Sequence, residues 1–245
     1  MRGMTHGLHV WGELACFTRP EMKVERFSYP LITPSAARGI FDAIYWKKSH
    51  HFYWQMERVE VLRPPRYIGI RRNEVKDKAP PERVVLAWMN GKRPAEPLWA
   101  DGDRESLGTD QKGRTQRQTM ALRDVRYRLY AHMEHRGDGR EMKAMDEQFK
   151  RRASAGKCFY QPYFGCREFP AYFSHIEPQT DPVSPMEWDG DLGWMLYDVF
   201  DLGKENGPDA APMVSVFEAQ VRRGVMGIPS YHDPRVKKTA EVMHA

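Results

Sequence analysis

The sequence predicts an α+β fold: a ferredoxin-like (RRM-type) domain with a large insertion between its central strands, followed by a small C-terminal antiparallel β-sheet. Apolar patterns of strand and helix period follow one another in the order β, α, β, β, α, β. A polar stretch interrupts this order, and short apolar runs at 194–202 and 213–222 follow it. We therefore expect a ferredoxin-like RNA-binding domain at 1–180, with its insertion at about 64–121, and a small C-terminal β region and tail at 181–245.

The first strand, helix and second strand are predicted from residue pattern and capping. Residues 8–17 are apolar and aromatic and form the first predicted strand. Thr33 then precedes Pro34, as expected where a hydroxyl caps a helix whose first turn begins with proline. Apolar residues recur through this helix at intervals of three and four, which gives it one buried face: Ala37, Ile40, Phe41 and Ile44. In the second strand, 52–61, the apolar side changes partway, which predicts a β-bulge near Arg58.

The insertion and the third strand differ sharply in composition. Residues 71–118 are rich in charge, Gly and Pro and are predicted to be an inserted, mobile excursion. Order returns at Leu122, and from Val125 to Met133 the residues of one face alternate with polar or aromatic residues of the other. One face of this strand is therefore core, and the other is predicted to be an exposed basic and aromatic face with Arg126, Arg128, Tyr130 and His132.

The second helix and fourth strand complete the predicted domain. Asp138 precedes the helix and Gly156 follows it, and its apolar stripe consists of Met142, Met145 and Phe149. The fourth strand is predicted at 158–163, with a continuation past Gly165. That glycine fits either a close backbone approach to a ligand or a bend in a strand.

Composition restricts the class of protein without assigning an activity. The chain has 245 residues and 41% hydrophobic content, enough for a packed core. With 38 Lys and Arg against 33 Asp and Glu, the net charge of +5 favours a polyanionic partner only if the cations cluster. Cys16, Cys158 and Cys166 form no CxxC pair, which argues against disulfides and zinc and favours a reducing cytoplasm, and Cys166 is interpreted as a structural thiol. No signal peptide and no apolar stretch of about 20 residues is found, so we expect a soluble cytoplasmic protein.

The junction between the first helix and the second strand is the strongest local candidate for binding. Residues 45–54, YWKKSHHFYW, combine aromatic rings that stack on bases with cations that neutralise phosphate. The alternative is a helix end favoured by cations, followed by core aromatics. Walker, dinucleotide-binding and HExxH motifs are absent from the sequence, and no metal or other cofactor is expected.

Five passages resemble the CRISPR-associated Cas-five family, in its subtype I-C (d-type) branch. They are VWGELACFTRPEMKVERFS at 10–28, YPLITPSAARGIFDAIYW at 29–46, RRNEV at 71–75, LRDVRY at 122–127 and QPYFGCREFP at 161–170. The resemblance implies a metal-independent endoribonuclease that cuts the repeat of precursor CRISPR RNA and keeps the 5′ handle as a subunit of the Cascade surveillance complex. Its implied partners are the repeat hairpin and 5′ handle of CRISPR RNA, the Cascade backbone and large subunits and, indirectly, target DNA, with no membrane.

The resemblance also implies site residues. In the family, a tyrosine at the end of the first helix and a lysine on the second helix are catalytic, and they correspond to Tyr45 and Lys143. Ala144 stands where the family commonly has a histidine, so His132, His135, His50 or His51 is a candidate substitute. The candidate RNA-binding residues are Arg19, Lys23, Arg26, Arg38, Lys47, Lys48, Arg126, Arg128, His132, Arg151, Arg152 and Arg167.

Two other functions stay open at this point. The departure at Ala144 is compatible with a subunit that binds the 5′ handle without cutting it. A protein whose basic face has only a structural use is the third possibility.

Overall fold

A computed structural model describes residues 2–22, 24–47, 51–102, 104–137, 139–176, 183–204 and 212–239. It divides into two compact units. The first comprises Met1–Ile68 with Met120–Ala245, and the second comprises Gly69–Thr119. Each unit is described by itself below.

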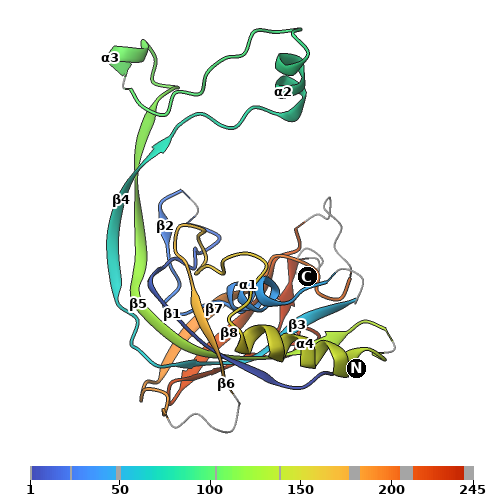
Figure 1. The fold of residues 1–245 in the computed structure, drawn as a ribbon. Coiled ribbons are helices and arrows are strands. Elements are labelled where there is room, and N and C mark those ends of the chain that lie inside the picture. The colour runs from blue at the N-terminus through green and yellow to red at the C-terminus, as the bar shows by residue number, and fades with distance from the viewer. Residues whose placement is uncertain are drawn as a thin grey trace. The chain divides into compact units, whose positions relative to one another are not determined.

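The first unit is a mixed α/β structure with a large antiparallel sheet and few helices (Figure 1). Along the sheet the strands follow the order β10-β8-β9-β3-β5-β1-β6, while β2 and β4 pair with β5, and β7 pairs with β8. The strands are β1 (His6–Ala15), β2 (Arg26–Phe27), β3 (Phe52–Val61), β4 (Tyr67–Val75), β5 (Arg114–His135), β6 (Tyr172–Ile176), β7 (Gly190–Asp198), β8 (Ser215–Arg222), β9 (Val225–Gly227) and β10 (Lys237–Lys238).

Two helices, α1 (Pro34–Ile44) and α4 (Met142–Ser154), pack on the same face of this sheet (Figure 1). The ring of Trp54 on β3 lies 4.9 Å from Phe41 of α1 and 4.6 Å from Phe149 of α4, measured between centroids. Phe41 and Phe149 also stack on each other at 5.5 Å. Because aromatic side chains bury large apolar areas, this cluster fixes both helices against β3.

The local signals in the first helix and second strand are confirmed. The side chain of Thr33 accepts a hydrogen bond from the backbone N–H of Ala36, and Pro34 is the first residue of α1. The pairing of β3 with β5 shifts register between Met56 and Arg58, which is the predicted bulge.

The predicted strand at 158–163 is wrong, because the fourth strand against β1 is β6, at Tyr172–Ile176. Residues 159 and 160 are both exposed, so they do not have the alternating burial of a strand. The chain here forms a loop, in which Phe164 donates its N–H to the carbonyl of Phe169, and Gly165 has φ +80°.

The C-terminal strands lie close to their predicted positions, but the first ends earlier, at Asp198. The carboxylate of Asp198 accepts the N–H groups of Val199 and Phe200 at 2.8 and 3.0 Å. This local turn ends β7, because a side chain bonded to the next two backbone donors favours a turn over a strand.

The second unit contains more regular structure than its composition indicated. It holds most of β4, the first part of β5 and the short helices α2 (Glu82–Met89) and α3 (Arg104–Leu107). Every residue of β4 is exposed or half-buried, so this strand has no apolar face that sequence periodicity could detect.

Candidate functional site

Tyr45 ends α1 and is held by both backbone and ring contacts. Its N–H donates to the carbonyl of Phe41 at 2.9 Å, and its own carbonyl accepts the indole N–H of Trp54 at 2.9 Å. The ring stacks on Phe52 with 5.9 Å between centroids, and the residue is only 5% exposed. Burial, with the nearby charge of Glu141, raises the pKa of the Tyr45 phenol, while Arg152 acts in the opposite direction.

Lys143 lies in the first turn of α4, two residues after Glu141, and its side chain is exposed. Ala144 beside it is exposed as well. Glu141, which precedes α4, and Arg152, which belongs to it, both act electrostatically on the Tyr45 phenol. A cation in the first helical turn adds to the positive end of the helix dipole, an arrangement that attracts anions.

Arg152 connects the C-terminal end of α1 to the loop that follows α4. Its Nε donates to the carbonyl of Ile44 at 2.6 Å, and its guanidinium lies 4.0 Å from the ring centroid of Phe159. A cation at the end of a helix satisfies a carbonyl that has no partner within the helix and interacts favourably with the helix dipole. Arg151 beside it is exposed and contacts Gln148.

Exposed aromatic and basic side chains surround this junction. Trp46 is 50% exposed, Phe159 61% and Tyr160 52%, and Lys47 and Arg167 are also exposed. The sequence alone did not identify Phe159 and Tyr160 as site residues, because they were assigned to a strand. Their signal is the pair of consecutive aromatics, which no strand with one buried face would place on both sides.

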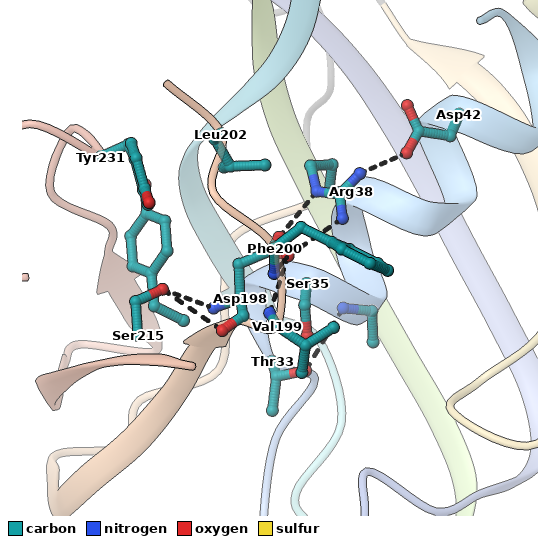
Figure 2. A network of polar contacts seen from close by, with 12 residues as sticks. Thr33, Ser35, Arg38, Asp42, Asp198, Val199, Phe200, Leu202, Ser215 and Tyr231 are labelled. Atoms are coloured by element: carbon teal, nitrogen blue, oxygen red, sulfur yellow. Dashed lines mark hydrogen bonds and ion pairs between the residues drawn. The ribbon is translucent and has the colours of Figure 1, made fainter. Parts of the chain in front are cut away.

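Arg38 is not on a binding surface, contrary to its place among the candidate RNA-binding residues. Its Nε and Nη2 donate to the Asp198 carboxylate at 2.7 and 3.2 Å, and its Nη1 donates to Asp42 at 2.6 Å (Figure 2). Its side chain is 17% exposed. With one guanidinium between two buried carboxylates, burial raises the pKa of Asp42 to about 6, and the charge of Arg38 only partly opposes this.

The predicted exposed basic and aromatic face of the third strand is wrong for Arg128, Tyr130 and His132, which are 3%, 2% and 6% exposed. Arg128 Nε lies 2.8 Å from Glu60, and His132 Nδ1 lies 2.6 Å from Glu57. Burial raises the pKa of Glu57, but the hydrogen bonds from His132 and Thr5 outweigh burial and lower this pKa to about 2. Glu57 and Glu60 on β3 therefore pair with the basic side chains of this face. Of the cations predicted there, Arg126 is half-exposed.

Arg19 and Arg26, near the N-terminus, each contact side chains of this protein. Arg19 lies 4.5 Å from the ring centroid of Tyr29, and Arg26 donates to Glu168 at 3.0 Å and to the Cys166 sulfur at 3.6 Å. Both remain half-exposed. Lys23, Lys48 and His50 lie outside the described residues.

Among the residues that the structure describes, His, Cys, Asp and Glu side chains form no group of three or more that could hold a metal ion. No helix in these ranges is long and apolar enough to cross a membrane.

Relatives of the chain are found by sequence along nearly its whole length. A family described as CRISPR-associated protein (Cas_Cas5) matches residues 7–232. A protein named CRISPR pre-crRNA endoribonuclease Cas5d from Mannheimia succiniciproducens is 41% identical over 239 residues, which cover 94% of this chain and 97% of the relative. A protein of the same name from Thermus thermophilus is 35% identical and covers 90% of each chain.

Solved structures agree on the fold. A crystal structure described as a CRISPR-associated protein superposes with a TM-score of 0.62 at 19% identity, covering 97% of this chain and 98% of the other. The functionally uncharacterized protein SMU1763c from Streptococcus mutans gives a TM-score of 0.60 at 18% identity, with 97% and 98% covered. With the family match and both relatives, these findings place the chain in the Cas5d family of CRISPR-associated proteins, in its subtype I-C branch.

Proposed function

We propose that this protein cuts the repeat of precursor CRISPR RNA and keeps the 5′ handle as a subunit of a type I-C Cascade complex, in contact with its backbone and large subunits. The names of both relatives, pre-crRNA endoribonuclease, support the reaction. The observation that carries the proposal is the packing of α1, which ends at Tyr45, against α4, whose first turn presents the exposed Lys143: Phe41 stacks on Phe149, and Arg152 bonds to the carbonyl of Ile44.

We also infer that the RNA-binding part is ferredoxin-like. The order β6-β1-β5-β3, with α1 following β1 and α4 following β5, supports this assignment, because a βαββαβ chain with neighbouring antiparallel strands gives that order. In this proposal the ferredoxin-like domain spans 1–180, and the strands after it form the small C-terminal β region at 181–245.

The proposed reaction needs no metal. The ribose 2′-OH next to the scissile phosphate attacks phosphorus in line, the P–O5′ bond breaks, and the products carry a 2′,3′-cyclic phosphate and a 5′-OH. The Lys143 ammonium stabilises the negative charge of the phosphorane. The Tyr45 phenol, whose pKa burial raises further above its ordinary value, is protonated near neutral pH and donates a proton to the departing 5′ oxygen.

The proton of the 2′-OH leaves to water in this scheme. His132 is not suited to accept it, because both of its ring nitrogens already contact carboxylates, Nδ1 that of Glu57 and Nε2 that of Glu134. By strand alternation His132 also lies on the opposite face of β5 from Met133, which is on the core side.

Cleavage of the chain's own repeat RNA in excess EDTA tests the proposal. Wild-type protein is expected to give one product pair, and Tyr45→Phe and Lys143→Ala are each expected to slow cutting about 100- to 10,000-fold. Lys237→Ala is the matched control, since Lys237 is exposed on β10. The assigned mechanism would be overturned if wild type gave no product, or if the two site variants cut as fast as wild type.

A second candidate function is a subunit that binds the handle without cutting it. The observation that favours it is the exposed Ala144, which leaves the position beside Lys143 without a titratable group. In that case wild type binds repeat RNA with strong salt dependence and yields no product. Ala144→His would separate the two functions, because it would create cutting only if Tyr45 and Lys143 are already correctly placed.

A further inference from the structure

Phe159 and Tyr160 present two consecutive aromatic rings to solvent beside the proposed site. Their exposed fractions are 61% and 52%, whereas Tyr163 is half-buried and Phe164 is fully buried in the same loop. Isolated exposed rings are common on protein surfaces, so exposure alone does not indicate a ligand. The contacts of Phe159 provide the second observation.

A backbone hydrogen bond and a cation–π contact hold Phe159 in place. Its backbone N–H donates to the carbonyl of Ala43 at 2.7 Å, which ties the loop to the last turn of α1. The guanidinium of Arg152 lies 4.0 Å from the ring centroid and is itself bonded to the carbonyl of Ile44 at 2.6 Å. One face of the ring therefore rests on an anchored cation, and with 61% of the residue exposed the other face is open.

The charges around these rings favour a polyanion over an apolar protein surface. The exposed cations nearby in sequence are Lys150, Arg151, Lys157 and Arg167, and the exposed Lys47 follows the end of α1, to which the loop is bonded. Burial, followed by the charge of Asp42, raises the pKa of the Tyr160 phenol, and Arg167 acts in the opposite direction. An apolar partner would have to remove water from these charges, whereas phosphates pair with them while a base stacks on the ring.

We propose that Phe159, with Tyr160 beside it, is a stacking platform for an unpaired base of the bound RNA. This inference rests on the proposed function and adds the element that distinguishes single-stranded from paired RNA at the site. Only an unstacked base offers a free face to an aromatic ring. Since Ala43 and Ile44 directly precede Tyr45, a base on Phe159 is held at the helix end that carries the proposed proton donor.

Fluorescence of 2-aminopurine tests the platform. Repeat RNA is prepared with this base at one unpaired position at a time, and quenching on binding reports stacking. For wild type we expect quenching at one or two positions. Phe159→Ala is expected to remove that quenching and weaken binding about 5- to 150-fold, with an unchanged salt slope, whereas Phe159→Trp is expected to retain both. Tyr172→Ala, which removes a ring that is 50% exposed on β6, is the matched control.

The outcomes separate this inference from the function on which it rests. If wild type neither binds nor cuts repeat RNA, the proposed function fails, and the platform fails with it. If wild type binds and Phe159→Ala binds and quenches as wild type does, only the platform is wrong. If Phe159→Ala keeps RNA binding but loses assembly with the other Cascade subunits, the rings are a protein contact and the platform is overturned.

Discussion

The guanidinium of Arg38 lies between the carboxylates of Asp42 and Asp198 inside the first unit (Figure 2). The Asp198 carboxylate also accepts the N–H groups of Val199 and Phe200, and the backbone N–H of Asp198 donates to the Ser215 hydroxyl, so this residue has little capacity to move. Arg38 therefore connects α1 to the end of β7. Its role is structural, whereas Arg167 is exposed.

Arg38→Ala is expected to destabilise the protein by about 3 kcal/mol or more, because it leaves two buried carboxylates without their cation. Arg167→Ala, at an exposed position, is expected to change stability by less than about 0.5 kcal/mol. Urea unfolding of the two variants measures the difference. Equal midpoints would contradict the structural role of Arg38.

Asp42 predicts a pH dependence of stability. Its pKa is about 6 in the folded protein against an ordinary value of 3.8, so folding takes up a proton between these values. The stabilisation is present below pH 3.8 and is lost as pH rises through 6, which amounts to about 1 kcal/mol between pH 5 and 7. Asp42→Asn is expected to remove this slope. Urea unfolding at the two pH values checks it, and an unchanged slope in the variant would assign the effect to another group.

At the scale of elements, the loop between α4 and β6 depends on Gly165. A Cβ added there would lie 2.1 Å from the carbonyl oxygen of Cys16, and φ is +80°. In the same place Cys16 donates its N–H to Phe164 at 3.0 Å. Of the two explanations for this glycine, close approach to a ligand and a need of the chain itself, the backbone of Cys16 favours the second.

Gly165→Ala is expected to cost more than about 2 kcal/mol of stability, because the overlap adds to the unfavourable φ. Gly156→Ala is its control, since Gly156 also has a positive φ, +63°, but an added Cβ there meets open space. That control is expected to cost about 1 kcal/mol. Thermal unfolding compares the pair, and a smaller loss in Gly165→Ala than in Gly156→Ala would contradict the close approach.

The elements that could be predicted from sequence have one clearly buried face. The cap at Thr33, the stripe of α1 and the alternation of β5 are local signals, and the bulge in β3 follows from a local change of side. β6 was missed because its residues are exposed or half-buried and give no periodic signal. The start of β5, in the second unit, was missed for a similar reason, since its first residues alternate between exposed and half-buried.

At the scale of the whole molecule, the net charge of +5 does not tell how many of the cations are exposed on the surface. Arg38 pairs with Asp198, which is 160 positions away in the sequence, and Arg128 pairs with Glu60 on another strand. Such ion pairs depend on tertiary contacts that sequence pattern does not report. Tyr45 and Lys143 could be proposed from the family resemblance, whereas the position of Phe159 on Arg152 required the structure.

The central claim is that the RNA's own 2′-OH cuts the repeat, with Tyr45 and Lys143 assisting. The most direct measurement compares all-ribose repeat RNA with the same RNA carrying a single 2′-deoxy nucleotide just upstream of the cut, both in excess EDTA. The account predicts that the first is cut to a 2′,3′-cyclic phosphate and a 5′-OH and that the second stays intact. Equal cutting of the deoxy RNA, or loss of cutting of the all-ribose RNA on chelation, would contradict it.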